Sequence, residues 1–206
     1  MNKIAFYQNR RDEVPNQELA RELAEAKDAE GIREIVDHLH NPNPNIQADC
    51  IKVLYEVGAL DPGLVAEYWE EFLALLRHKH NRMVWGGMCA LAAIAGLRAQ
   101  ELGPHVAEIE RAMDAGSVIT VDNGVKALAD IAAGAPEFSP AIFPYMLNHL
   151  RTCRLKEVPQ HSEKTLPAVT AANKAEFIDL LQNRMERMTA PQSARVKRVI
   201  KSAEKR

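Results

Sequence analysis

The chain carries several histidines at spacings that suggest metal chemistry. His38, His40, His78 and His80 lie near equivalent points of two successive segments. Imidazoles are common ligands of zinc and iron, but such a site needs three or four ligands in a fixed geometry, usually with carboxylate or thiolate help. No cysteine and no nearby acid in the sequence completes either pair. We therefore predict no metal site and no cofactor.

Other catalytic groups form no recognisable set in linear order. There is no serine–histidine–acid motif, glycine-rich phosphate loop or cysteine cluster. The three cysteines, Cys50, Cys89 and Cys153, form no CxxC pair, which argues against a disulfide framework and favours a reducing compartment. The N-terminus has no apolar run long enough for a signal peptide or membrane span. We expect a cytoplasmic protein that does not associate with membranes, and the sequence favours a non-catalytic over an enzymatic role.

The elements that must position these side chains recur about every 37 residues. The segment 45–57 (NIQADCIKVLYEV) aligns with 82–94 (RMVWGGMCALAAI) and 119–131 (ITVDNGVKALADI). Their apolar positions coincide in three rows: Ile51, Met88 and Val125; Leu54, Leu91 and Leu128; Val57, Ile94 and Ile131. A repeat of this length predicts stacked helix pairs rather than a domain with a single core.

A second set of apolar rows precedes the first in each repeat. These rows are Ile32, Trp69, Val106 and Phe143; Ile35, Phe72, Ile109 and Met146; Leu39, Leu76, Met113 and Leu150. Spacings of three and four residues place each set on one helix face. Polar turns such as 40–45 (HNPNPN) separate the two helices of a pair, and Gly or Pro segments such as 58–63 (GALDPG) separate the pairs.

The two ends differ from the central repeats. Residues 1–14 are expected to be irregular and either extended or loosely attached, and 15–206 to form one α-solenoid domain that begins with a capping helix. Pro159 and Pro167 should interrupt the helix expected at 157–169. A last pair follows at 174–188 and 191–203, with these residues inward: Ile178, Leu181, Met185, Val196, Val199 and Ile200. The prediction is an all-α fold of about four to five helix pairs.

The second-helix segments, such as NPNPNIQADCIKVLYEVG, resemble repeats of the HEAT/armadillo superfamily, in particular short bacterial HEAT-like arrays. The resemblance covers about residues 32–171. It implies a right-handed α-α superhelix with first helices on the convex side and second helices on the concave side. Such surfaces usually bind another protein, sometimes nucleic acid, and occasionally host catalysis. Gln47, Val84 and Val121 stand near a position that is basic in many HEAT repeats, so the chain departs from that pattern there.

Residues of the second helices that point away from the apolar rows are expected to line the concave face. We predict a binding surface for a protein or peptide from Asp49, Lys52, Glu56, Trp85, Asn123, Lys126 and Asp130. Two interpretations of Trp85 stay open: it anchors a partner, or it fills the gap left by Gly86 and Gly87. The charged residues, equally, either contact a partner or only solvate the helix faces. A non-catalytic scaffold or adaptor is the predicted function.

Nucleic-acid binding is the alternative. A basic patch at the C-terminus consists of Arg195, Lys197, Arg198 and Lys201, and it either contacts phosphates or belongs to a solvated capping helix. The chain is similar in size to HEAT-like DNA glycosylases, in which aromatic and acidic residues stand in a basic groove. Trp85, Asp122 and Asp130 offer those residue types. The predicted groove, however, has too few Lys or Arg to neutralise several phosphates, which disfavours this alternative.

Overall fold

The computed structural model describes residues 1–206 and consists of helices and connecting turns, without strands. The α-helices are α1 (Val14–Ala26), α2 (Ala29–Asp37), α3 (Pro44–Leu60), α4 (Trp69–Leu75), α5 (Asn81–Ile94), α6 (Ala99–Leu102), α7 (Val106–Ala115), α8 (Val118–Gly134), α9 (Ser139–Thr152), α10 (Val158–Thr165), α11 (Lys174–Met185) and α12 (Ala190–Ala203). The all-α prediction is confirmed. None of these helices has the length and apolar content needed to span a bilayer.

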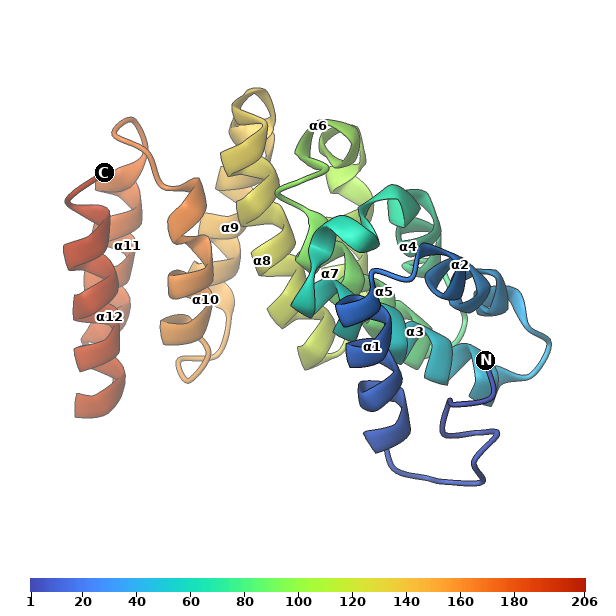
Figure 1. Ribbon diagram of the computed structural model, residues 1–206. Coiled ribbons are helices and arrows are strands. Elements are labelled where there is room, and N and C mark those ends of the chain that lie inside the picture. The colour runs from blue at the N-terminus through green and yellow to red at the C-terminus, as the bar shows by residue number, and fades with distance from the viewer.

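Ten of the helices form five consecutive pairs, α2/α3, α4/α5, α7/α8, α9/α10 and α11/α12, whose members pack on each other. The pairs follow one another in chain order, so the two termini lie toward opposite ends of the array (Figure 1). Helix α1 packs on α3 and occupies the place of a preceding second helix. The expected number of pairs and the N-terminal capping helix are therefore present.

The array curves because its two rows of helices are packed unequally. Each second helix packs along the next, in the order α3, α5, α8, α10 and α12, whereas successive first helices make fewer contacts with one another. Glycine contributes to this close approach: a Cβ added to Gly86 on α5 would lie 2.7 Å from Cγ1 of Ile51 on α3. The row of second helices is thus the concave side, which we call the inner face.

The predicted apolar rows form the core. All nine residues of the second-helix rows are at most 1% exposed. The first-helix rows are also buried, except that Trp69 and Val106 are half-buried. Fully burying one such aliphatic side chain contributes about 1.5–3 kcal/mol, so the rows supply the main stabilisation between neighbouring pairs. The buried apolar residues form one continuous cluster from Ile4 to Ala203.

The first thirteen residues contain no helix, but they are held firmly. Ile4 is fully buried and joins the apolar core. The backbone N–H of Ala5 donates to Asn16 Oδ1 at 2.9 Å, and that of Phe6 donates to Asp49 Oδ2 at 2.8 Å. The expectation of a loosely attached segment is therefore wrong, because one apolar side chain and two backbone hydrogen bonds tie it to α1 and α3.

The C-terminal repeats differ from the prediction at two places, Pro159 and α11. Pro159 does not interrupt a helix, because it lies in the first turn of α10, where a missing N–H is tolerated. Helix α10 ends at Thr165, and Pro167 lies in the 3-10 turn that follows, as its missing N–H requires. In α12, the three predicted inward residues are buried. In α11, Leu181 is buried as predicted. Phe177 and Leu180 are also buried, whereas the predicted Ile178 and Met185 are only half-buried. The buried face of α11 is thus rotated by about one residue relative to the face predicted from the sequence.

Candidate functional site

The inner face contains the side chains predicted to bind a partner, but its N-terminal part is occupied by the chain itself. Asp49 on α3 accepts hydrogen bonds from the Phe6 backbone and from Asn16 Nδ2, the latter at 2.9 Å. Both carboxylate oxygens therefore have partners within the protein. Asp49 fastens the N-terminal segment and is not available to a ligand in this arrangement.

Lys52 is also enclosed. Its side chain is 7% exposed, and Nζ lies 3.0 Å from Glu13 Oε2 and 2.5 Å from Glu56 Oε1. The ammonium group also lies over the Tyr55 ring, 4.8 Å from its centroid. Burial alone would lower the pKa of Lys52, but its contacts with the carboxylates of Glu56 and Glu13 outweigh burial and raise it. Lys52 thus lies buried beneath the half-exposed carboxylates of Glu13 and Glu56, and this ion cluster closes this part of the inner face.

Trp85 lies near the middle of the inner face and is half-buried. Its ring packs against Tyr55, with 5.9 Å between centroids, and the Arg82 guanidinium lies 6.0 Å from its ring centroid. Trp85 does not fill the space beside the two glycines. Ile51 occupies the space next to Gly86, and Leu75 with the backbone of Phe72 occupies the space next to Gly87.

A depression of about 460 Å³ lies between α3, α5 and α8, next to the Tyr55–Trp85 pair. It is lined by Tyr55, Gly58, Ala59, Pro62, Cys89, Ala92, Ala93, Asn123 and Lys126. Asn123 Nδ2 donates to the Ile119 carbonyl at 2.9 Å and contacts Cys89 Sγ at 3.2 Å. The amide oxygen of Asn123 has no hydrogen-bond partner in the chain. The depression therefore combines small side chains with one free acceptor.

The thiol and ammonium groups around the depression are poorly suited to nucleophilic chemistry. Burial raises the pKa of Cys89 to about 11, so its thiol is protonated at neutral pH. Lys126 Nζ donates to the Ala92 carbonyl at 2.6 Å and to Asp130 Oδ2 at 2.7 Å. Burial lowers the pKa of Lys164, which favours the neutral amine, but its Nζ is held by a hydrogen bond of 2.6 Å to the Asp122 carbonyl. Each cation is therefore engaged by the protein's own oxygens.

The basic residues of α12 differ in their environment. Arg195 makes two hydrogen bonds to the Glu163 carboxylate, from Nε to Oε1 and from a terminal nitrogen to Oε2, both 2.6 Å. Lys197, Arg198 and Lys201 are exposed and make no ion pair. In the predicted basic patch, the charge of Arg195 is thus neutralised by Glu163, whereas the other three side chains are exposed to solvent and unpaired.

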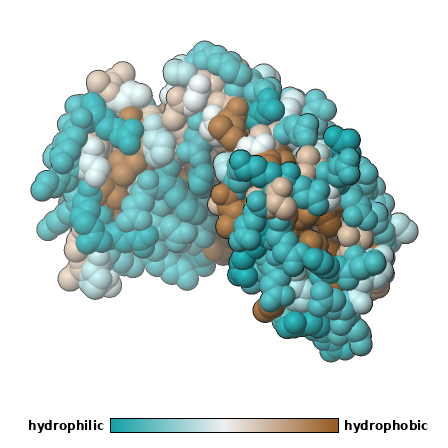
Figure 2. Space-filling model, in the orientation of Figure 1, coloured by the Kyte–Doolittle hydropathy of each residue, from teal (hydrophilic) through white to brown (hydrophobic).

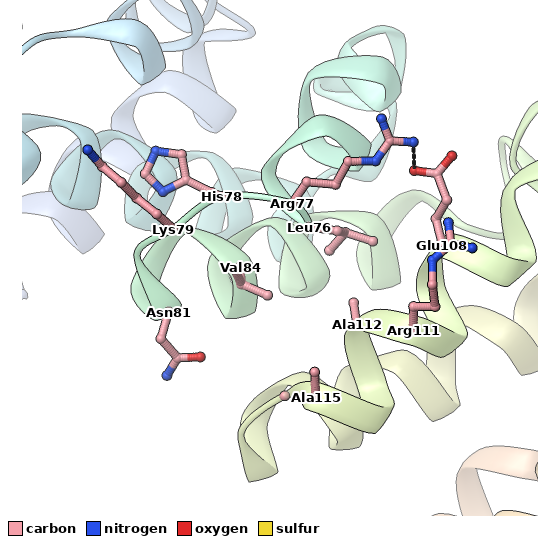
Figure 3. A pocket seen from close by; sticks show the side chains of 11 residues that line it. Leu76, Arg77, His78, Lys79, Asn81, Val84, Glu108, Arg111, Ala112 and Ala115 are labelled. Carbon is pink, nitrogen blue, oxygen red and sulfur yellow. Dashed lines mark ion pairs between the residues drawn. The ribbon is translucent and has the colours of Figure 1, made fainter.

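The histidines that suggested a metal site do not form one. His40 Nε2 lies 3.0 Å from Glu71 Oε2, so His40 does have an acidic neighbour in the fold, although the two residues are distant in sequence. The His78 and His80 rings are 5.3 Å apart. A pocket of about 340 Å³ beside His78 is lined by the turn after α4 and by α7, where Glu108 pairs with Arg77 at 2.5 Å (Figure 3). No group of three ligands gathers at these positions.

A different group of metal-binding residue types does gather. His149, Cys153 and His161 lie together where α9 meets α10, and His161 also contacts Asp122 on α8. The sequence gives little sign of this group, because His149 and Cys153 match no metal-binding motif and His161 lies in a segment that contains two prolines. The spacing of four residues between His149 and Cys153 is the one signal that was present.

Comparison with known proteins identifies the class of fold. No family model and no curated protein matches the chain. Among solved structures, an engineered protein has a TM-score of 0.70 at 16% identity over 92% of this chain and 53% of its own. A second engineered protein has a TM-score of 0.66 at 18% identity, covering 95% of both chains. A designed armadillo repeat protein in complex with the peptide (KR)4 has a TM-score of 0.66 at 12% identity over 94% of this chain and 90% of its own.

These similarities show that the chain has the armadillo-like helical repeat fold. The predicted resemblance to HEAT/armadillo arrays is thereby confirmed at the level of architecture.

Proposed function

We propose that this protein is a non-catalytic scaffold whose inner face binds an extended segment of another protein. The observation that supports this most directly is the half-buried Tyr55–Trp85 pair beside the depression between α3, α5 and α8. Partly exposed tryptophan and tyrosine next to a hollow are typical of residues that contribute most of the energy of a protein–protein contact.

The polar groups of the depression suit a peptide backbone. The free amide oxygen of Asn123 accepts a backbone N–H, while Cys89 and Ala93 leave room for the peptide to approach α5. Extended peptides are recognised through such a combination of backbone hydrogen bonds and side-chain pockets. Hydrophilic residues cover most of the face shown in Figure 2, and hydrophobic residues appear there only in separate patches. A small number of anchoring contacts is therefore expected.

A designed armadillo protein of similar fold was solved in complex with the peptide (KR)4, which supports a peptide as the kind of partner. The charge of the ligand is a separate matter. Around the depression, Glu56 is paired with Lys52, and Asp130 is paired with Lys126. Because these charges are already compensated, we expect a partner of mixed composition rather than a strongly basic or acidic one.

Nucleic acid fits the inner face less well. Affinity for nucleic acid depends on Lys and Arg that replace counterions at the phosphates. On the inner face, Lys126 is paired with Asp130 and Arg195 with Glu163. The exposed cations of α12 lie at the end of the array and not beside Trp85. This distribution supports the protein-binding proposal over the alternative.

A selection with peptides displayed on phage tests the proposal. Peptides selected against the full-length protein would be synthesised with a fluorescent label, and their affinity measured by polarisation. We expect Trp85→Ala to weaken binding by about tenfold or more, as for a central anchoring residue. Asn123→Ala should weaken it by a smaller factor, because one hydrogen bond is lost.

Asn148→Ala on α9 is the matched control, since Asn148 is an exposed amide on a first helix. It should leave the affinity unchanged. The proposal is wrong if no peptide is enriched, or if the selected peptides bind Trp85→Ala as well as the unmodified protein.

A further inference from the structure

Three side chains of the types that bind transition metals meet at the junction of α9 and α10. His149 lies near the end of α9, Cys153 directly follows this helix, and His161 is on α10. One ligand atom from each residue lies within 4.8 Å of the other two. His149 Nε2 is 2.9 Å from His161 Nδ1. The packing of a single helix pair therefore brings the two nitrogens and the sulfur together.

Asp122 on α8 determines which nitrogen of His161 carries a proton. Its Oδ1 lies 2.6 Å from His161 Nε2, and a carboxylate only accepts, so the proton is on Nε2. In the neutral ring, the lone pair is then on Nδ1 and faces His149. Gln160 Nε2 donates to Asp122 Oδ2 at 3.0 Å and orients the carboxylate. A carboxylate behind a histidine in this manner is typical of imidazoles that bind metals.

Burial differs across the cluster. The His161 side chain is 1% exposed, whereas His149 and Cys153 are half-buried. One side of the cluster is thus closed by the protein, and the other side is accessible from solvent. The Arg184 guanidinium donates to the carbonyls of Arg151 and Cys153, which holds the turn that carries the thiol. The site is therefore partly preformed and reachable by an ion.

We propose that His149 Nε2, His161 Nδ1 and Cys153 Sγ bind one divalent transition-metal ion, for which zinc is the best chemical match. Zinc combines imidazole and thiolate ligands in tetrahedral sites, whereas magnesium and calcium take oxygen ligands. In such a site the ligand atoms lie about 3.3–3.6 Å apart. The two nitrogens must separate by a few tenths of an ångström and the thiol must approach. Three protein ligands leave the fourth position to water.

Binding of the ion releases one proton from the site. Without the ion, His149 Nε2–H donates to His161 Nδ1. On binding, His149 moves its proton to Nδ1, His161 keeps its proton on Nε2 toward Asp122, and the Cys153 thiol releases one proton to solvent. The ion joins α9, the following turn and α10, and through Asp122 it connects them to α8. Binding of the ion to the folded state therefore stabilises the packing of these helices.

Cobalt(II) titration of the metal-free, full-length protein tests the site. We expect one equivalent of cobalt to bind, with visible bands of a tetrahedral site and a thiolate-to-cobalt charge-transfer band in the near ultraviolet. One equivalent of zinc should remove both. Cys153→Ser should abolish the charge-transfer band, and Asp122→Asn should weaken the affinity about 10–100-fold. Cys89→Ser and His78→Gln are the matched controls and should bind like the unmodified protein.

The inference is overturned if the unmodified protein shows no cobalt bands or if Cys153→Ser keeps the charge-transfer band. A measurement on the unmodified protein covers the case in which a variant fails to fold. Cysteine alkylation followed by mass spectrometry, with and without zinc, should show protection of Cys153 but not of Cys89. Equal alkylation of Cys153 in both conditions also overturns the inference.

Discussion

Asp122 and His161 are 39 residues apart in sequence, and Asp122 Oδ1 lies 2.6 Å from His161 Nε2. The first residue is on α8 and the second on α10, so their contact connects two successive helix pairs. Lys164, one turn after His161, donates to the backbone carbonyl of the same aspartate at 2.6 Å. Asp122 therefore joins the two pairs through polar contacts with Gln160, His161 and Lys164.

Asp122→Asn should lower the free energy of unfolding of the metal-free protein by about 1–3 kcal/mol. The amide oxygen can still accept from His161 but carries no charge, and the amide nitrogen cannot accept the hydrogen bond that Gln160 Nε2 donates to Asp122 Oδ2. Asp130→Asn is the control. Asp130 pairs with Lys126, whose side chain is 45% exposed, so its loss should cost about 1 kcal/mol or less. Urea unfolding followed by circular dichroism measures both. Equal losses in the free energy of unfolding would show that the Asp122–His161 contact contributes no more to stability than the Lys126–Asp130 pair.

Gly86→Ala should destabilise the protein, because its Cβ would lie 2.7 Å from Cγ1 of the fully buried Ile51. Overpacking of this kind costs about 1–3 kcal/mol, which exceeds the gain in helix propensity. Gly96→Ala is the control, since its Cβ would meet only Asp130 Cβ at 4.0 Å. Thermal unfolding should give a lower midpoint for Gly86→Ala alone. The Gly86→Ala, Ile51→Ala double variant should lose less than the sum of the single losses.

Lys52→Glu should be far more destabilising than Lys126→Glu. The former places a third carboxylate beside Glu13 and Glu56 at a position that is 7% exposed, where an uncompensated charge costs about 3–5 kcal/mol. The latter changes a side chain that is 45% exposed, where ion pairs contribute about 1 kcal/mol or less. Denaturant midpoints of the two variants would settle the order. A similar loss in both would mean that Glu13 does not close over Lys52 in solution.

Glu108 should make stability depend on pH in the acid range. Burial alone would raise the pKa of Glu108, but hydrogen bonds from His105 and Arg77 outweigh it, and its pKa is lowered. The ion pair with Arg77 is drawn in Figure 3. A carboxylate with a lowered pKa stabilises the folded state fully above its unfolded pKa of about 4.3. This contribution is lost as the pH falls through the folded pKa.

The midpoint difference between the unmodified protein and Glu108→Gln should thus be largest near neutral pH. It should shrink once the pH falls below about 4.3. Glu70→Gln on the exposed side of α4 is the control and should show no such trend. A difference that stays constant down to about pH 3 would contradict the lowered pKa.

The apolar pattern was sufficient to predict the helical repeats. Ile51, Met88 and Val125 occupy one row in the sequence and one buried layer in the structure. Helix formation and the choice of buried face depend on residues three or four positions apart, which lie next to each other along the chain. The end of α10 before Pro167 was predictable for the same reason, because the effect of a proline on a helix is also local.

The environment of each polar group could not be predicted in the same way. Lys52 and Lys126 occupy equivalent positions, and each precedes an acid by four residues, yet their side chains are 7% and 45% exposed. The difference arises because Glu13, at the start of α1, covers only Lys52. The residues that surround the two lysines in the sequence do not indicate the Glu13–Lys52 contact.

By itself, then, the sequence determined the fold class, the repeat boundaries and the side of each central helix that packs inward, since these depend on neighbours within one helix. Tertiary structure decided that Asp49 binds the N-terminal segment, and that His149 and His161 meet Cys153 in front of Asp122. Such contacts depend on how each helix is rotated against the next. A rotation of one residue, as in α11, is enough to change which polar atoms meet.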